Sequence, residues 1–180
     1  GDAGMLAGGD INVNGASTVN GRVHANGDIN ANFLQVNLEL GGLDDSGMTE
    51  GFEKDLPMID FSIYDDVVEL PRQEGKGKNK GSYYCDFDFS GDLGGEVSYC
   101  NGYVEIGSGF SNATILSSGD VDNNGAISIG EFFGDVDTEI IAKGDVSFSG
   151  ASAVWGGWFL AGGDINQNGA SSFYGSMIAH

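Results

Sequence analysis

The feature that most constrains this chain is a short internal repeat that begins with the pair Gly-Asp. Near the N-terminus, Gly9-Asp10 and Gly27-Asp28 are 18 residues apart, and the interval divides into three hexapeptides. Each hexapeptide begins with glycine and ends with asparagine, and its third and fifth residues are mostly apolar. The pattern returns at Gly119-Asp120, Gly144-Asp145 and Gly163-Asp164. A fixed period of this kind indicates an architecture of stacked repeats.

The spacing within each hexapeptide indicates how one repeat folds. The third and fifth residues are two apart, so in an extended chain their side chains point to the same face. Asn and Gly at the boundaries suit a sharp corner, because both tolerate a positive φ. Three short strands and three corners per turn predict an all-β fold, a triangular parallel β-solenoid (β-helix) with coils of 18–19 residues. A long irregular sheet is the alternative for an alternating, glycine-rich sequence.

The middle of the chain departs from this repeat. Residues 41–82 lack the hexapeptide pattern and predict a lateral insertion made of loop and short helix. We therefore expect one β-solenoid domain over residues 1–180, interrupted by this excursion. The composition agrees, because 32 of the 180 residues are glycine, which is poor inside helices.

The charge of the chain limits the kinds of partner that it can bind. It carries 27 acidic and 7 basic residues, a net charge of −20, which argues against nucleic acid and anionic membranes and allows divalent cations and basic surfaces. Four of the basic residues gather in a polar run that reads as a loop, either solvated or docked on an acidic face of a neighbouring copy; they are Arg72, Lys76, Lys78 and Lys80. No apolar stretch is long enough to span a membrane, so no direct membrane insertion of this segment is expected. The first residue is Gly1, and we expect a mature or excised product.

The two cysteines, Cys85 and Cys100, each lie in a segment that reads as a strand. Their spacing does not match a metal or redox motif, so a cross-strand disulfide is expected, with two buried free thiols as the alternative. A disulfide indicates export, and closing a loop of 15 residues would stabilise the fold by about 3 kcal/mol.

One segment matches the pattern of a calcium-binding loop. It has acidic or amide residues at loop positions 1, 3 and 5, glycine at 6 and glutamate at 12, so its predicted ligands are Asp120, Asp122, Asn124, Ala126 (through its carbonyl) and Glu131. Such a loop wraps oxygen ligands around a hard cation. The same residues also form a Gly-Asp corner of the repeat, so a corner without an ion is the alternative. Calcium is the one cofactor that the sequence predicts, and no organic cofactor is expected.

The aspartates of the Gly-Asp pairs occupy equivalent positions in successive coils and should stack about 5 Å apart. Such stacked carboxylates would repel, so either bound cations relieve the repulsion or each carboxylate accepts hydrogen bonds from corner amides. The predicted ladder comprises Asp10, Asp28, Asp120, Asp145 and Asp164, with Asp10 and Asp28 as a pair at the other end of the stack. No constellation of catalytic residues is apparent, and we do not expect an enzyme.

These motifs together resemble a known group of proteins. The Gly-Asp-[Ile/Val]-x-x-Asn-Gly units, the segment Leu56-Pro57-Met58-Ile59-Asp60 and the closing run Trp158–Asp164 resemble polymer-forming β-solenoid domains of type IV pilin-like (minor-pilin) surface proteins. The chain is also similar in design to the bactofilins, which polymerise end to end. The resemblance implies a structural role and no catalytic residues. The hydrophobic pilin helix is absent from this sequence.

The sequence thus predicts an extracellular or cell-surface structural protein. Both ends of the chain lie within the repeat, so we expect copies to stack end to end into a filament or surface fibre, with calcium as a stabilising ion. The alternative is a monomeric adhesin or pilus-tip module that recognises a glycan or a surface. Its groove would be lined by exposed aromatic residues, namely Tyr83, Tyr84, Tyr99, Tyr103 and Trp155.

Overall fold

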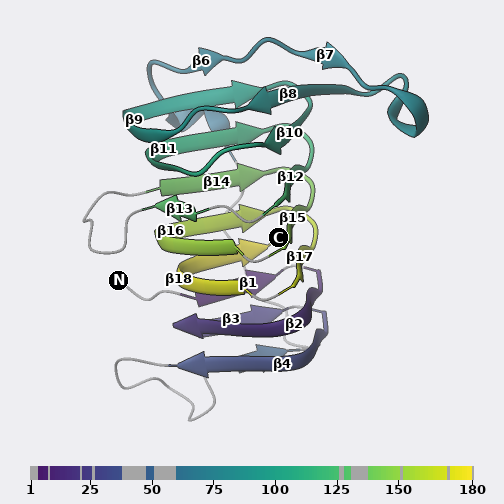
Figure 1. Cartoon of the computed structure of the whole chain (residues 1–180), viewed down its shortest axis with the longest axis vertical. Coiled ribbons are helices and arrows are strands. Elements are labelled where there is room, and N and C mark those ends of the chain that lie inside the picture. The colour runs from purple at the N-terminus through teal and green to yellow at the C-terminus, as the bar shows by residue number, and fades with distance from the viewer. Residues whose placement is uncertain are drawn as a thin grey trace.

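A computed structural model shows the chain as a tall stack of β-strands (Figure 1). The described residues are 4–7, 9–20, 22–25, 27–37, 48–50, 60–125, 128–130, 138–150, 152–169 and 171–179. Of the residues predicted to form the insertion, 41–47 and 51–59 therefore lie outside the described part.

The described part contains strands and two short 3₁₀ helices. The strands are β1 (Gly4–Ala7), β2 (Ile11–Asn20), β3 (Arg22–Ala25), β4 (Ile29–Asn37), β5 (Met48–Glu50), β6 (Val68–Glu69), β7 (Gln73–Glu74), β8 (Tyr83–Phe87), β9 (Gly91–Cys100), β10 (Tyr103–Ile106), β11 (Phe110–Ser117), β12 (Val121–Asn124), β13 (Ser128–Gly130), β14 (Thr138–Ala142), β15 (Val146–Ser149), β16 (Ser152–Ala161), β17 (Ile165–Asn168) and β18 (Ser171–Ala179). The helices are η1 (Phe61–Ile63) and η2 (Gly77–Asn79).

The repeat residues form the core of the stack, as their alternation predicts. Successive turns of the chain, here called rows, pair through parallel strands, so that β10 pairs with β8 on one side and with β12 on the other. The third residue of each hexapeptide then lies directly over its counterpart, and these side chains are buried. In register order they are Val104, Val121, Val146, Ile165 and Ile11, each 0% exposed. Each such aliphatic side chain contributes about 1.5–3 kcal/mol by its burial.

The predicted triangular parallel β-solenoid is wrong as a description of this fold. The sheet is mixed, because β7 pairs antiparallel with β8, and the structure does not close. The rows are also not uniformly built of three short strands: β12, β13 and β14 are separate, but β2 and β16 are each continuous over ten residues. Gly15, at a predicted corner, lies inside β2, where its positive φ of 113° accompanies a shift of register against β4. The hexapeptide boundary is thus a bulge within a long strand at this position.

The order of the rows in space differs from their order in the chain. Residues 4–50 descend to one end of the stack, and the chain resumes at the opposite end with β8 and β9 (Figure 1). It then descends again, so that β17 pairs with β2 and β18 pairs with β1 and β2. The predicted placement of Asp10 and Asp28 at the far end of the aspartate ladder from Asp164 is therefore partly wrong, because Asp10 follows directly after Asp164.

A strap over residues 60–70 covers one face of the stack. Its side chains Phe61 and Tyr64 pack against a small apolar cluster that is separate from the main core and contains Leu116, Ile141 and Leu160. After the strap, residues 71–82 form a hairpin that carries β7 and η2 and projects sideways from the top of the stack (Figure 1). The strap and the hairpin are the described parts of the predicted insertion.

The predicted disulfide is confirmed. Cys85 in β8 and Cys100 in β9 are bonded to each other, and both are fully buried. The bond joins β8 to β9, which pair with β7 and β6 at the top of the stack (Figure 1).

Candidate functional site

The aspartates of the Gly-Asp pairs form a continuous hydrogen-bonded ladder down one corner of the stack. The carboxylate of Asp120 accepts a hydrogen bond from the backbone N–H of Asp145 at 2.8 Å, and that of Asp145 accepts from the N–H of Asp164 at 2.8 Å. The ladder continues from Asp164 to the N–H of Asp10 at 3.0 Å and from Asp10 to that of Asp28 at 2.9 Å. Of the two ways to relieve the repulsion, the structure shows the second, in which carboxylates accept amide hydrogens.

The same geometry explains why glycine precedes each of these aspartates. A Cβ atom at Gly144 would overlap Oδ1 of Asp120, and one at Gly163 would overlap Oδ1 of Asp145. Gly9 and Gly27 are blocked in the same way by Asp164 and Asp10. None of these four glycines has a positive φ, so at this corner glycine supplies space for the carboxylate of the row above.

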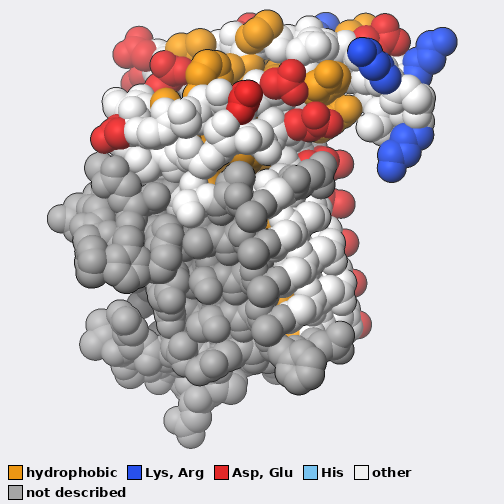
Figure 2. Space-filling view, viewed as in Figure 1, with side chains coloured by type: hydrophobic (Ala, Val, Ile, Leu, Met, Phe, Trp, Pro, Cys, Tyr) orange, Lys and Arg blue, Asp and Glu red, His pale blue; other side chains and the backbone are white. Residues whose placement is uncertain are grey.

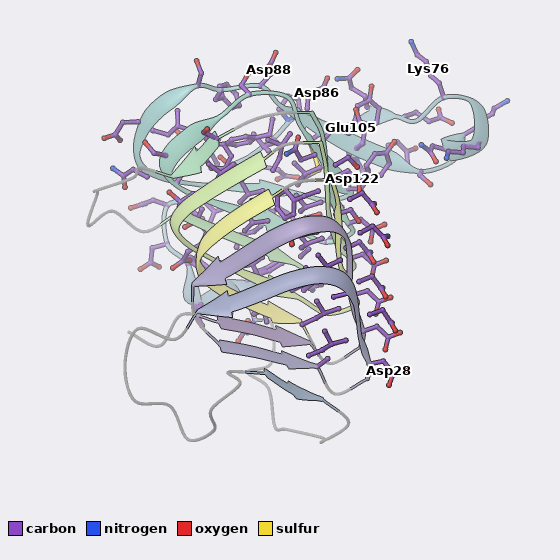
Figure 3. The ribbon with its side chains drawn as sticks, turned by 60° about the horizontal axis from the view of Figure 1, so that its bottom comes forward. Asp28, Lys76, Asp86, Asp88, Glu105 and Asp122 are labelled. Atoms are coloured by element: carbon purple, nitrogen blue, oxygen red, sulfur yellow. A yellow bond between two sulfur atoms is a disulfide. The ribbon has the colours of Figure 1, made fainter. Side chains whose placement is uncertain are left out.

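A second polar column runs beside the aspartate ladder and is formed by the residue two positions after each ladder residue. In its lower part Asn30 donates to Asn12 at 3.0 Å, and Asn12 donates to Asn166 at 3.0 Å. In its upper part the equivalent positions carry the carboxylates Asp122, Glu105 and Asp86, which lie along one edge (Figure 3). Carboxylates cannot donate to one another, so this upper part lacks the hydrogen bonds of the lower part.

Asp122 shows the electrostatic result of this arrangement. Burial raises the pKa of its carboxyl above the usual value, and the neighbouring charges of Asp120, Glu105 and Asp145 raise it further. The acidic face, defined here as the aspartate ladder together with Glu105 and Asp122, is therefore a region of strong negative potential.

The aspartate ladder ends at its upper side in two tyrosines. Tyr103 occupies the corner position directly above Asp120, and Tyr84 lies above Tyr103. Their rings are stacked with centroids 5.3 Å apart. The change from aspartate to tyrosine coincides with a groove of about 400 Å³, lined by Arg72, Ser82, Tyr83, Asn101, Gly102, Tyr103, Ser118, Gly119 and Asp120.

The groove combines aromatic rings with hydrogen-bonding groups. The guanidinium of Arg72 lies over the ring of Tyr83, 4.4 Å from its centroid, and its Nη1 donates to the carbonyl of Asn101 at 3.5 Å. The hydroxyl of Ser118 donates to the side-chain carbonyl of Asn101 at 3.2 Å. Tyr83 remains 45% exposed. A small polar ligand with one flat face would match these groups.

The structure gathers only some of the aromatic residues predicted to line a groove. Tyr83 and Tyr103 line it, and Tyr84 stacks on Tyr103. Tyr99 instead packs edge-on against Phe61 of the strap, with ring centroids 5.8 Å apart. The side chain of Trp155 lies outside the described residues. The sequence analysis did not predict Arg72 as a groove residue. The position of the groove was easier to predict, because Gly102-Tyr103 aligns with the Gly-Asp pairs and differs from them in its second residue.

The predicted calcium loop is described only in part. Asp122 and Asn124 lie in the extended strand β12, Asp120 directly precedes it, and the carboxylate of Asp120 is hydrogen-bonded within the ladder. Ala126 and Glu131 lie outside the described residues. Among the residues that are described, no group of three or more metal-binding side chains is close enough to hold an ion. Calcium binding by this segment stays a prediction.

Basic and acidic side chains are segregated on the surface. Figure 2 shows acidic side chains in a column along one edge of the stack and basic side chains on the hairpin beside its upper end. Arg72 and the three lysines of the hairpin are exposed, and Lys76 points away from the stack (Figure 3). Among the described residues, the large apolar side chains that are exposed are Ile63, Val67, Val68, Tyr83 and Phe89.

Comparisons with protein-family models, with curated proteins and with solved structures give no match. Within the described part of the chain, neither helix has the length or the apolar character needed to cross a membrane.

Proposed function

We propose that this protein is an extracellular structural protein that assembles with copies of itself, the basic hairpin of one copy lying against the acidic face of the next. The observation that carries the proposal is the segregation of opposite charges on one chain. Residues 71–82 contain four basic residues and one acidic residue, a net charge of +3, whereas the whole chain carries −20. Such complementary patches attract over about 8–10 Å at moderate ionic strength.

The positions of the two patches favour open assembly. The hairpin projects from the top of the stack, whereas the acidic face runs down its edge (Figure 2). Contact between two different patches is heterologous, so each bound copy leaves one hairpin and one acidic face available, and the contact propagates. The expected pairing of terminal repeats between copies carries no weight in this proposal, because β17 and β18 already pair with β1 and β2 of the same chain.

The remaining expectations fit this role. A buried disulfide suits an oxidising compartment and supports the proposed location outside the cell or on its surface. Calcium is the exception, because it was predicted as a stabilising ion of the fibre, whereas in this arrangement it would compete with the hairpin for the carboxylates of the acidic face and would weaken the contact. The sequence motifs that resemble those of pilin-like and bactofilin-like proteins also imply self-assembly, and we propose no catalytic activity.

Sedimentation and electron microscopy of the purified protein test the proposal. We expect the average mass to exceed that of a monomer at low salt and to fall as salt is added, since screening weakens the contact. A variant with Lys76→Glu, Lys78→Glu and Lys80→Glu should remain monomeric. The matched control replaces the same lysines by arginine and should assemble like the natural protein. A monodisperse monomer at every salt concentration, with or without calcium, would contradict the proposal.

The groove beneath Tyr83 favours a second candidate function, a monomeric surface module that recognises a glycan. Aromatic rings beside amide and hydroxyl groups are the side chains that hold sugar rings in shallow sites. Binding of monomeric protein on a glycan array, lost on Tyr83→Ala, would support this function. An array on which natural protein and Tyr83→Ala give the same signals would contradict it.

A further inference from the structure

The aspartate ladder repeats one hydrogen bond, and the groove interrupts it. At four successive corners the backbone N–H of an aspartate donates to a carboxylate of the row above, at 2.8–3.0 Å. The fifth corner is that of Asp120, and the residue above it is Tyr103, which has no carboxylate. The described part of the chain includes the rows on both sides of Asp120, and within it the structure shows no acceptor for the N–H of Asp120.

The neighbouring glycines show the same interruption independently. At Gly144, Gly163, Gly9 and Gly27 the space beside Cα is filled by a carboxylate oxygen. At Gly119 the corresponding space faces only backbone atoms, the nearest 3.2 Å from where a Cβ would lie. The corner above Asp120 therefore keeps the backbone geometry of the ladder without the carboxylate that occupies the lower corners.

This empty position lies within the groove. Gly119, Asp120 and Arg72 all form part of its lining. A carboxylate that entered here would accept the N–H of Asp120, as the ladder carboxylates do, and would lie in the field of the Arg72 guanidinium. Hydrogen bonds between a carboxylate and such donors are stronger than neutral ones.

We infer that the groove binds a sugar that carries a carboxylate, a uronic acid, with the carboxylate seated on the N–H of Asp120. Tyr83 and Tyr103 line the groove and would provide an apolar surface for the sugar ring, while Ser82, Ser118 and Asn101 would supply partners for its hydroxyls. A volume of about 400 Å³ suits one or two sugar units. The inference rests on the second candidate function and is independent of self-assembly.

Titrations with glucuronic acid and with glucose, followed by amide NMR, test this assignment. The two sugars share a ring and differ in the carboxylate. We expect glucuronate to shift the amide proton of Asp120 and to bind at least tenfold more tightly than glucose. Arg72→Ala should weaken glucuronate binding about tenfold and glucose binding much less.

A substitution at Tyr103 separates this assignment from a general loss of binding. Tyr103→Asp supplies the missing carboxylate from the chain itself, so it should abolish the glucuronate shift at Asp120 while the ladder amides keep their positions. Ile63→Asp is the control, because it adds the same carboxylate at a position that is 72% exposed and outside the groove lining, and it should bind as the natural protein does. Equal binding of the two sugars would overturn the inference and leave the glycan-binding function standing. If neither sugar binds, or if glucuronate binds without moving the Asp120 amide, the inference also fails.

Discussion

At the scale of single residues, the Gly-Asp pair works across rows. The aspartate of one row uses the space left free by the glycine of the next row. The carboxylate of Asp120 lies where the Cβ atom of a larger residue at Gly144 would be. The carboxylate then reaches the N–H of Asp145, which directly follows that glycine. Each pair therefore prepares the position of the next row, and this complementarity favours one register of stacking.

Replacing Gly144 by alanine tests this complementarity. The added Cβ would displace the Asp120 carboxylate and break its bond to Asp145, so we expect a loss of about 1–3 kcal/mol in unfolding free energy. Gly125→Ala is the control, because no atom lies within 4 Å of a Cβ there. Chemical denaturation measures both. Equal midpoints for the two variants would show that the ladder tolerates displacement of one carboxylate.

Asp122 gives a prediction about pH. Its pKa is raised in the folded protein, chiefly by burial, so the folded state holds this proton more tightly than the unfolded chain does. The free energy of unfolding therefore falls as pH rises from about 3.8 through the raised pKa, and it stays lower above that range. Asp122→Asn removes this loss, and its amide can donate to Glu105 as Asn12 does to Asn166.

We expect Asp122→Asn to raise the melting temperature at neutral pH, with a gain on the order of 1 kcal/mol from one added hydrogen bond and less repulsion. The part of the gain that comes from charge should disappear well below pH 3.8, where both states are protonated. Melting curves across this range measure the effect, with Asp65→Asn on an exposed loop as the control. A gain that did not change with pH would show that the charge of Asp122 has no part in it.

Residue roles were predictable from the sequence only where they arise within one row. The alternation of Ile11 and Val13 predicted which side chains are buried, and both are. The role of Gly144 was not predictable, because its reason lies in an aspartate 24 residues earlier in the chain. Glycine was expected to supply a positive φ, which holds at Gly15 and Gly169 but not at the Gly-Asp corners.

At the scale of elements, the strap at residues 60–70 completes the fold by covering an apolar face. Phe61 packs edge-on against Tyr99, and Nζ of Lys143 lies 5.0 Å from the Phe61 ring centroid. The hydroxyl of Tyr64 donates to the Glu139 carboxylate at 3.1 Å, and burial together with that carboxylate raises the pKa of Tyr64. The strap thus ties η1 to β9 and β14.

Phe61→Ala should loosen this attachment. The substitution removes the contacts with Tyr99 and Lys143 from a partly buried position, so we expect a cost of about 1–3 kcal/mol, below that of a core phenylalanine. Limited proteolysis should then cut the strap faster. Ile63→Ala on the same helix is the control, because that side chain is 72% exposed. The packing role would be excluded by equal cleavage rates for the two variants.

Strand positions followed from alternation, but their lengths and partners did not. A period of six residues favoured short strands with corners, whereas β16 continues through the boundary with a shift of register at Trp155 and Gly157. The antiparallel pair β7–β8 arises from the hairpin, which lies outside the repeat. This pairing depends on where the hairpin brings the chain back to the stack, and the local sequence pattern carries no information about that position.

At the scale of the whole molecule, the order of rows determines which surfaces are available. Chain order suggested that the first and last repeats lie at opposite ends, yet β17 lies against β2 in the structure. The reason is that equivalent repeats carry equivalent residues, so the row of Ile165 can stack on the row of Ile11 as readily as on that of Val146. The groove was likewise unpredictable, because it requires the hairpin to return beside the corner of Tyr103.

A pair of cysteines can test whether the last row stacks on the first within one chain. Asn12 and Asn166 are in register and hydrogen-bonded at 3.0 Å, so cysteines at both positions would lie within reach of a disulfide. We expect oxidation of Asn12→Cys, Asn166→Cys to give a cross-linked monomer on a non-reducing gel. The native cysteines do not interfere, since Cys85 and Cys100 are already bonded and buried.

The control moves one cysteine a row further away. Asn30 lies below Asn12 in the same column. In the variant Asn30→Cys, Asn166→Cys the two Cα atoms are therefore two row spacings apart, about 10 Å, which is too far for a disulfide. This variant should remain uncross-linked. If the first pair instead gave dimers and higher species, the last row of one copy would be stacking on the first row of another. The same strand pairing would then build the polymer directly, and the charge contact between hairpin and acidic face would be unnecessary for assembly.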